Sequence, residues 1–401
     1  MSKILIVLYP DPVTGYPPEY ARDTIPSIND YPGGATLPSP QALDFTPGEL
    51  LGCVSGGLGL RDWLESEGHT VVVTSDKEGP DSVFERELPD ADIVISQPFW
   101  PAYLTPERIE KARNLKLVVT AGIGSDHTDL DAANARGITV AEVTYSNSIS
   151  VAEHTVMQVL VLVRDFVKQH EISAAGGWNI ADAVERSYDL EGMRVGVFAA
   201  GRIGRAVIER LAPFGVHLSY TDRFRLSEDY ERKYNLTYHD SIESLVQNID
   251  VLTVHAPLTA ETRGLLNTEL LNTMPRGAYI VNPARAAIAD RDAIVQALES
   301  GQLAGYAGDV WDPQPAPVDH PWRTMPHNAM TPHTSGTSLS GQARYAAGTR
   351  EILEDWFAGN DIRPEYLIVE GGSYKGVGAT SYAKVPTKAD EGQAELSQAT
   401  S

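Results

Sequence analysis

The chain has 401 residues, of which 42% are hydrophobic and 21% are charged, so packed globular domains are expected and wholesale disorder is excluded. The length favours two or three domains. The 54 acidic residues outnumber the 32 basic ones and give a net charge of -22, which argues against binding of nucleic acid or of an anionic membrane surface. An anionic substrate would be repelled at a distance, so a local cation must hold it.

Cys53 is the only cysteine, which excludes an intrachain disulfide, a four-cysteine zinc site and iron–sulfur clusters held by several cysteines. A single cysteine also fits a reducing compartment. The apolar run at 4–8 is too short for a signal peptide, and no stretch approaches the roughly 18 apolar residues of a membrane span. We therefore expect a cytoplasmic enzyme or binding protein with no metal site, no nucleic-acid partner and no membrane partner.

Strands alternate with helical segments along the first 150 residues. A buried strand is predicted at 4–8, a long loop rich in Pro, Gly, Asp and Tyr at 10–50, and a helix at 57–67. Further strands are predicted in three apolar runs, at 70–74, 92–96 and 115–120. Strands separated by helical spacers favour a parallel sheet that is covered on both faces.

A second α/β region follows a long buried helix predicted at 150–164, where Ser150 and Glu153 stand at the spacing of a capping box. Its strands are predicted at 194–200, 216–221, 250–255, 278–282 and 306–309. A helix is expected at 342–356, and the tail from Gly371 is expected to wrap loosely or to be disordered because it has little to bury. The fold class is therefore α/β, with two Rossmann-like doubly wound parallel-sheet domains and a cleft between them.

The strongest local signal lies at 194–222, where a predicted strand runs into the segment AAGRIG at 199–204 and is followed by a helix, a strand and an acid. This resembles the Gly-x-Gly-x-x-Gly fingerprint of a dinucleotide-binding unit, with Ala199 in place of the first glycine. Gly201 lets the backbone approach a pyrophosphate, and Gly204 lets the helix pack closely on the strand. The helix N-terminus and Arg202 favour the anion. A tight turn without a ligand is the structural alternative.

Asp222 ends the second strand of this unit, 21 residues after Gly201. Its carboxylate can accept both ribose hydroxyls and would repel a 2′-phosphate, so the expected cofactor is NAD rather than NADP. Arg223 and Arg225 follow immediately, which allows some tolerance of NADP.

Three later segments place Arg285, Asp309 and His333 at or beyond predicted strand ends. They read VNPAR at 281–285, GDVWDPQP at 308–315 and MTPHTSG at 330–336. Ligands of open α/β sheets bind beyond the carboxyl ends of strands, so these side chains are candidate site residues. Each alone has a structural reading, as a surface ion pair, a helix cap or a loop histidine. Together, in this order, they resemble the D-2-hydroxyacid dehydrogenase superfamily over nearly the whole chain.

Shorter motifs narrow the resemblance to metal-free NAD-dependent formate dehydrogenases. They are QPFWP at 97–101, TAGIGSDH at 120–127, TYSNSIS at 144–150, the segment at 309–317 that contains Gln314, and DHPW at 319–322. The resemblance implies oxidation of formate to carbon dioxide by direct hydride transfer to NAD, which gives NADH.

The resemblance implies a formate pocket organised around Arg285, which would hold and orient the carboxylate. An opposite charge at about 4 Å is worth on the order of 4 kcal/mol at an effective dielectric near 20. Asn147 would donate its amide to the other oxygen. A backbone N–H and a wall that admits only a very small acid would come from Ile123, Gly124, Pro98 and Phe99.

His333 and Gln314 would form a pair in which glutamine replaces the glutamate usual in the wider superfamily. There, the histidine removes a hydroxyl proton, but formate has none, so a base is unnecessary. Gln314 would orient His333 without the charge that raises the pKa of an imidazole. We hypothesise that this broadens the active pH range.

On the cofactor side, the resemblance implies that Asp309 holds the nicotinamide carboxamide. The other implied NAD contacts are Ser148, Gly201, Arg202, Ile203, Gly204, Asp222, Pro257, Leu258, Thr259, Ala260, Glu261, Pro283, His333, Thr334, Ser335 and Gly336. The family commonly has His where Phe224 and Thr259 stand, and Thr and Gly where Pro283 and Ala286 stand. Pro283 offers no N–H, so these departures bear on cofactor affinity and on the preference between NAD and NADP.

The substrate domain is expected to comprise residues 1–147 and 334–401, and the NAD-binding domain residues 148–333. The resemblance implies a homodimer joined through the cofactor domains, with the helix at 150–164 apolar enough to take part. One alternative is another 2-hydroxyacid dehydrogenase, such as a glycerate or lactate enzyme, against which Gln314 and the apolar wall argue. The other is an NAD-binding corepressor or scaffold, which would need neither Arg285 nor His333.

Overall fold

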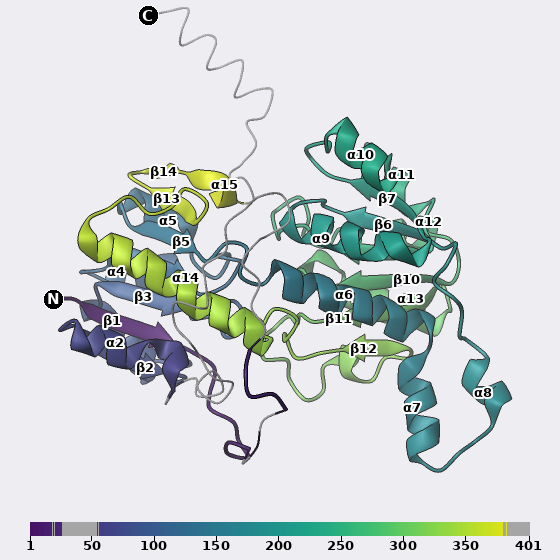
Figure 1. Cartoon of the computed structure of the whole chain (residues 1–401), viewed down its shortest axis with the longest axis horizontal. Helices are drawn as coiled ribbons and strands as arrows, with labels where there is room; N and C mark the ends of the chain where they lie inside the picture. The colour runs from purple at the N-terminus through teal and green to yellow at the C-terminus, as the bar shows by residue number, and fades with distance from the viewer. Residues whose placement is uncertain (18, 20, 26–53, 55, 380–381, 383–401) are drawn as a thin grey trace, which may run out of the picture.

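The first of two seven-stranded sheets is built from the beginning and the end of the chain (Figure 1). The computed structural model describes residues 1–17, 19, 21–25, 54, 56–379 and 382. The strand order is β14-β13-β5-β4-β3-β1-β2. The strands are β1 (Lys3–Val7), β2 (Thr70–Thr74), β3 (Ile93–Ser96), β4 (Leu117–Thr120), β5 (Thr139–Glu142), β13 (Leu367–Glu370) and β14 (Ser373–Tyr374). Strands β1 to β5 pair in parallel, whereas β13 pairs antiparallel with both β5 and β14.

Both faces of this sheet are buried, which accounts for its nearly continuous apolar strands. On one face, Ile4 and Ile6 of β1 belong to a cluster that includes side chains of the helices α2 (Arg61–Ser66) and α14 (Leu339–Ala358). On the other face, Leu5 and Val7 join a second cluster. That cluster includes side chains of α3 (Val83–Glu87), α4 (Pro106–Lys111) and α5 (Leu130–Ala135). Because side chains alternate along a strand, one run of five apolar residues supplies both cores.

The second sheet is parallel throughout and has the order β12-β11-β10-β9-β6-β7-β8. Its strands are β6 (Arg194–Phe198), β7 (His217–Thr221), β8 (Thr237–Tyr238), β9 (Val251–Val254), β10 (Ala278–Asn282), β11 (Leu303–Gly308) and β12 (Asn328–Met330). The two sheets confirm the predicted α/β class (Figure 1). The chain order reverses beside β6, which lies between β7 and β9, so the predicted fingerprint begins at a topological switch point.

Helices cover both faces of the second sheet. One face packs against α6 (Ser148–Val163) and α9 (Arg202–Leu211). The opposite face packs against α11 (Ile242–Val246), α12 (Thr268–Thr273) and α13 (Arg291–Glu299). The remaining helices of this half are α7 (Phe166–Ala174), α8 (Ile180–Val184) and α10 (Glu228–Tyr234). Short 3-10 turns lie at Gly57–Gly59, Leu88–Asp90, Ala212–Phe214, Ala286–Ile288 and Pro321–Arg323.

The predicted capping box at Ser150 is wrong. The helix α6 begins two residues earlier, after Asn147, and has no side-chain cap. Ser150 lies inside the first turn, where its Oγ is 2.9 Å from Ser338 Oγ, and Glu153 pairs with Arg210 at 3.3 Å. The Ser150 hydroxyl therefore binds the residue before α14, and it does not cap the helix as the local spacing predicted.

Two other predictions need correction. The helix predicted at 57–67 is broken at Leu60, whose φ of 51° ends the 3-10 turn before α2 begins. The tail from Gly371 is not loose throughout, because β14 pairs with β13, the short helix α15 (Gly376–Ala379) follows, and the Tyr382 ring packs against the first-sheet core. Most of the loop predicted at 10–50, Cys53 and residues 383–401 lie outside the described residues.

Candidate functional site

Arg285 lies just after the carboxyl end of β10 and reaches across to the first sheet's half of the chain. Its Nε is 2.9 Å from Asp126 Oδ2, and the same guanidinium also contacts Oδ1, so the pair is bidentate. Burial raises the pKa of Asp126, but the Arg285 charge and hydrogen bonds outweigh it and hold that pKa well below its usual range. The Arg285 side chain is 23% exposed, so it is not fully enclosed, and its Nη1 donates to the Ala284 carbonyl at 2.8 Å. Asp126 was not predicted as a site residue, although it stands in the motif at 120–127.

The loop between β4 and Asp126 leaves no room for side chains beside this guanidinium. A Cβ on Gly124 would lie 2.0 Å from Arg285 Nη2, and one on Gly122 would lie 2.9 Å from Pro98 Cδ. Both glycines have positive φ angles, of 117° and 149°. The Gly124 N–H donates to Glu142 Oε2 at 3.2 Å, so this N–H is already engaged. Ile123, between the two glycines, is half-buried.

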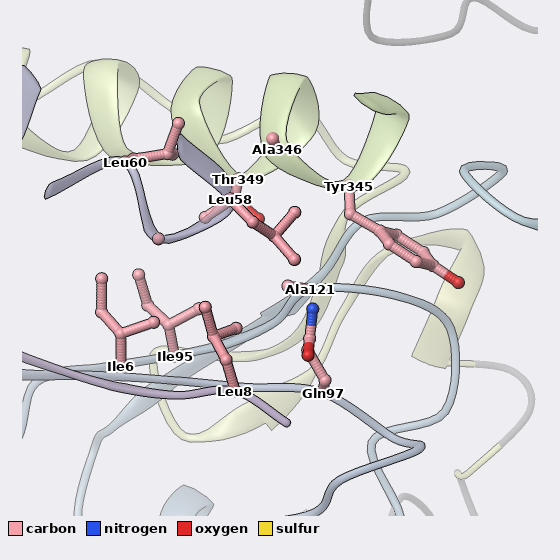
Figure 2. Close-up of a pocket in the computed structure, with 11 residues that line it drawn as sticks. Ile6, Leu8, Leu58, Leu60, Ile95, Gln97, Ala121, Tyr345, Ala346 and Thr349 are labelled. Atoms are coloured by element: carbon pink, nitrogen blue, oxygen red, sulfur yellow. The ribbon is translucent and has the colours of Figure 1, made fainter. Parts of the chain in front are cut away.

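An aromatic wall stands beside the loop. The Phe99 ring centroid lies 5.6 Å from Tyr9, 5.8 Å from Tyr345 and 6.3 Å from His333. A small and mostly apolar cavity lies behind this wall, under α14 (Figure 2). Gln97, which follows β3, points toward α14 in that view, and its amide atoms have no partner among the described residues. Tyr345 was also not singled out from the sequence.

His333 and Gln314 are joined as a pair. His333 Nδ1 lies 2.8 Å from Gln314 Oε1, and Gln314 Nε2 donates to the Phe99 carbonyl at 3.0 Å. This second bond assigns the amide orientation, so Nδ1 is the donor to Gln314. Burial lowers the pKa of His333 to about 4. His333 also has a φ of 61°, a left-handed conformation that non-glycine residues adopt at a cost.

Asn147 and Ser148 lie at the start of α6, and both side chains are buried. Asn147 Oδ1 and Ser148 Oγ have no hydrogen-bond partner among the described residues. A Cβ on Gly336 would lie 2.7 Å from Asn147 Nδ2, so Gly336 packs directly on the amide. The Tyr345 hydroxyl donates to the Gly336 carbonyl at 2.6 Å, which fixes the loop opposite Asn147.

Asp309 is fully buried after β11 and anchors the segment that carries His333. Its oxygens accept from the N–H groups of Thr334 at 2.8 Å and Ser335 at 2.7 Å. The Thr331 hydroxyl donates to the same carboxylate at 2.5 Å. The carboxylate thus holds the backbone that follows His333 and the Thr331 side chain that precedes it.

The fingerprint forms the turn between β6 and α9. Ala199 has a φ of 71°, which a glycine would adopt without strain. A Cβ on Gly204 would lie 2.2 Å from the Ala199 carbonyl oxygen, so only glycine fits there. Space beside Gly201 is open, with nothing within 4 Å of a Cβ built on it. Arg202 and half-buried Ile203 open the helix α9, with Arg202 Nη2 3.6 Å from Glu142 Oε1.

Asp222 stands beside this turn at the end of β7. Its oxygens accept from the N–H groups of Ala200 at 2.7 Å and Phe224 at 3.0 Å, so the carboxylate is fixed. Arg225 is bound to Glu231 by two hydrogen bonds of 2.9 Å. Arg223 instead pairs with the exposed Glu261 at 2.8 Å.

The segment from 257 to 261 follows β9, and the Arg223–Glu261 pair brings it beside Asp222. The Thr262 hydroxyl donates to the Pro257 carbonyl at 2.7 Å and accepts from the Thr259 N–H at 2.8 Å. Leu258 packs against the second-sheet core, whereas Ala260 is exposed. Pro283 is buried just after β10.

The residues around the fingerprint suit a dinucleotide. The close packing at Gly204, the open backbone at Gly201, the ten-residue helix α9 and the fixed Asp222 carboxylate are the parts that such a ligand needs. The unpartnered Ser148 hydroxyl and the buried ring nitrogens of His255, also without partners, are polar groups that a ligand could satisfy.

Within the described part of the chain, no group of three or more His, Cys, Asp or Glu side chains could hold a metal ion. Among the helices of the described residues, none is both long and apolar enough to cross a membrane.

Comparisons with known proteins agree with this geometry. Residues 156–335 match the family model of the D-isomer specific 2-hydroxyacid dehydrogenase NAD binding domain. The chain is 67% identical over 384 residues to a formate dehydrogenase of Pseudomonas sp. (strain 101), covering 96% of each. A solved Granulicella formate dehydrogenase is 65% identical, with a TM-score of 0.91 over 94% of this chain and 100% of that one. An NAD-dependent formate dehydrogenase from Staphylococcus aureus, solved with NAD, is 41% identical, with a TM-score of 0.77 over 92% and 100%.

Proposed function

Since the chain belongs to the formate dehydrogenase family, we propose that it oxidises formate to carbon dioxide and transfers the hydride directly to NAD, without a metal ion. The observation that carries the proposal is the Arg285 guanidinium, held by Asp126 and packed against Gly124 of the loop. A cation fixed in this way can bind a carboxylate in one orientation.

Different residues of the site would bind the formate anion, donate hydrogen bonds to it and exclude larger molecules. Arg285 holds the carboxylate through the part of the guanidinium that Asp126 does not cover. Asn147 donates its side-chain amide to a carboxylate oxygen, and the Ile123 N–H is the remaining backbone donor of the loop, because the Gly124 N–H is engaged. The Phe99 ring and the Pro98 side chain exclude larger acids and water. Asp126 is a positioning residue, since it acts through Arg285.

NAD, when bound, supplies the hydride acceptor, and positioning is the contribution of the protein. The turn at Gly201 and the start of α9 would bind the pyrophosphate, and Asp222 the ribose. The remaining cofactor contacts are proposed for Ser148, Arg202, Ile203, Gly204, Pro257, Leu258, Thr259, Ala260, Glu261, Pro283, Asp309, His333, Thr334, Ser335 and Gly336. Besides this contact, Asp309 would fix the segment that follows His333, because its oxygens accept the N–H groups of Thr334 and Ser335.

His333 has no hydroxyl proton to remove from formate, so it would contact the carboxylate rather than act as a base. Gln314 fixes the ring through a neutral hydrogen bond. An amide at this place adds no negative charge that would raise the pKa of the histidine. This neutral pair also distinguishes the proposal from the 2-hydroxyacid alternative, in which a carboxylate partner would support proton removal.

The test is the formation of NADH, followed by absorbance, with formate, lactate and glycerate offered separately. Turnover with formate alone is expected. Turnover with lactate or glycerate and none with formate would reverse the assignment to a 2-hydroxyacid dehydrogenase. Binding of NAD without turnover of any of the three acids would favour the corepressor or scaffold.

For the cofactor, we propose a strong preference for NAD with limited acceptance of NADP. The fixed Asp222 carboxylate would repel a 2′-phosphate, and Arg225 is committed to Glu231. Arg223 is the cation left to meet such a phosphate, because its pair with Glu261 is exposed. The ratio of kcat/KM for NAD and NADP with formate measures this preference.

We also propose two domains, residues 1–147 with 334–401 for the substrate and 148–333 for NAD. Support comes from the two separate sheets, which draw their strands from 3–142 with 367–374 and from 194–330. The division can be tested by placing a protease cleavage site near residue 147 or near residue 333. Light scattering would then compare the molar mass of each protein before and after cleavage.

A homodimer is proposed through α7, α8 and the neighbouring part of α6. Phe166, Ile180 and Val184 are 57%, 63% and 54% exposed, and Trp178 is 85% exposed, whereas half of the apolar side chains of α6 are buried. Sedimentation of Trp178→Ser against the wild-type chain tests this surface. A cytoplasmic location is proposed from the single cysteine and is testable by cell fractionation.

A further inference from the structure

Tyr382 brings the end of the described chain to the loop that faces Arg285. It follows α15, which lies beside β13 at the edge of the first sheet (Figure 1). The Ser125 N–H donates to the Tyr382 hydroxyl at 2.8 Å, and the hydroxyl donates to Glu142 Oε2 at 3.1 Å. Burial and the Glu142 charge raise the pKa of Tyr382 well above its usual value, so the hydroxyl keeps its proton.

Glu142, at the end of β5, gathers several donors on one buried carboxylate. The residue is 1% exposed. Besides Tyr382, its Oε2 accepts from the Gly124 N–H at 3.2 Å and from the Ser125 hydroxyl at 3.0 Å. Its other oxygen lies 3.6 Å from Arg202 of the fingerprint. One carboxylate oxygen therefore binds the loop beside Arg285, and the other lies near Arg202 at the start of α9.

The loop needs such restraint because its own backbone is permissive. Gly122 and Gly124 have φ angles of 149° and 117°, which leave alternative conformations accessible. The residues that follow determine the orientation of the Arg285 guanidinium. Asp126 binds Arg285 directly, and a Cβ on Gly124 would overlap the guanidinium. A shift of this loop would therefore move Arg285.

We propose that Tyr382 is a positioning residue of the formate site, which acts with Glu142 to fix residues 124–126 and, through Asp126, the Arg285 guanidinium. The inference rests on the proposed oxidation of formate. It assigns the C-terminal segment a part in substrate affinity rather than only in covering the sheet edge.

The test compares the full-length Tyr382→Phe variant with Tyr374→Phe. Both substitutions remove a hydroxyl from the same C-terminal segment, and the Tyr374 hydroxyl binds Asp131, away from the site, at 2.9 Å. Tyr382→Phe is expected to raise the KM for formate roughly ten-fold, the loss typical of one hydrogen bond to a charged group. The KM for NAD and the Tm should stay close to those of Tyr374→Phe.

Glu142→Gln provides an independent readout, because it removes the charge from both the formate loop and Arg202. This variant should raise the KM for both formate and NAD. The double variant Tyr382→Phe/Glu142→Gln should show a formate effect smaller than the product of the two single effects, since both residues act through one loop.

An unchanged KM for formate in Tyr382→Phe would overturn the proposal. Equal rises of both KM values together with a lower Tm would overturn it as well, and would make Tyr382 a purely structural residue. If Tyr382→Phe does not fold, the variants Ser125→Ala and Glu142→Gln are combined instead. Additive effects of these two substitutions on the KM for formate would refute the proposal that both act through one loop. A wild-type chain that turns over no formate would instead refute the proposed function, whatever the variants show.

Discussion

The dinucleotide fingerprint and the formate clamp are built by opposite means. The fingerprint is one continuous strand–turn–helix segment, and the binding groups that we propose for it are backbone N–H groups in a turn that contains two glycines. The clamp is the Arg285 side chain. We propose that its orientation depends on Asp126, 159 residues away, on a loop with two glycines at positive φ and on the C-terminal segment. The geometry of the first is set by neighbours along the chain, whereas the second exists only when both sheets are in place.

The comparison predicts that small changes beside Arg285 are far more damaging than changes at the open Gly201 of the fingerprint turn. Gly124→Ala should lower kcat/KM for formate by on the order of 10²-fold or more, because the methyl group displaces the guanidinium. Steady-state kinetics with formate varied at saturating NAD measures the effect. Gly137→Ala is the matched control, since Gly137 also has a positive φ but open space around it. Equal losses in the two variants would mean that backbone strain, and not the contact with Arg285, is responsible.

On the fingerprint side, Asp222→Ser should lower the NAD over NADP ratio of kcat/KM at least ten-fold, about 1.4 kcal/mol. The substitution removes the carboxylate that would face a 2′-phosphate and leaves Arg223 nearby. The ratio is the readout because the lost bond to the Ala200 N–H weakens binding of both cofactors. Asp229→Ser, on exposed α10, controls for net charge. A ratio that changes equally in both variants would count against a specific role of Asp222.

Gln314→Glu should make the reaction pH-dependent near neutrality. Burial lowers the pKa of His333 to about 4, so the neutral ring dominates above that pH and loses its dominance only as the pH falls through it. A carboxylate at 314 would raise this pKa and move the protonation step upward, into the range in which enzymes are assayed. The wild-type profile of kcat/KM between pH 5.5 and 8.5 should be flat by comparison. Superimposable profiles of the two proteins would refute the neutral-partner hypothesis.

The smallest expected effect concerns the turn itself. Ala199→Gly should stabilise the protein by up to about 1 kcal/mol, because glycine adopts the φ of 71° without the left-handed penalty. Ala200→Gly, at the neighbouring position without a positive φ, should destabilise it by roughly 0.5–1 kcal/mol. Chemical denaturation at equilibrium separates the two. A lower stability for Ala199→Gly would mean that the strain at this alanine is already compensated.

The contrast between local and long-range geometry explains which parts of the fold and of the site could be predicted from the sequence. Periodicity and spacing predicted the parallel sheets, the β6–α9 turn and Asp222, because each depends on neighbours along the chain. The Gln314–His333 pair was implied by a family resemblance, and the structure brings the two side chains together. Asp126, Glu142 and Tyr382 were missed because their significance lies in partners from distant segments. The wrong capping box at Ser150 arose in the same way, since the Ser150 hydroxyl bonds the hydroxyl of Ser338, the residue before α14.

The most direct test of the central claim measures formate turnover and NAD binding in the double variant Arg285→Gln/Asp126→Asn. The paired substitution removes the cation without leaving the Asp126 carboxylate unpaired beside it. Turnover of formate should fall by on the order of 10³-fold, while the Kd for NAD, from protein fluorescence, changes less than about three-fold. Formate turnover within ten-fold of the wild-type chain would contradict the account, because the anion would then be held elsewhere.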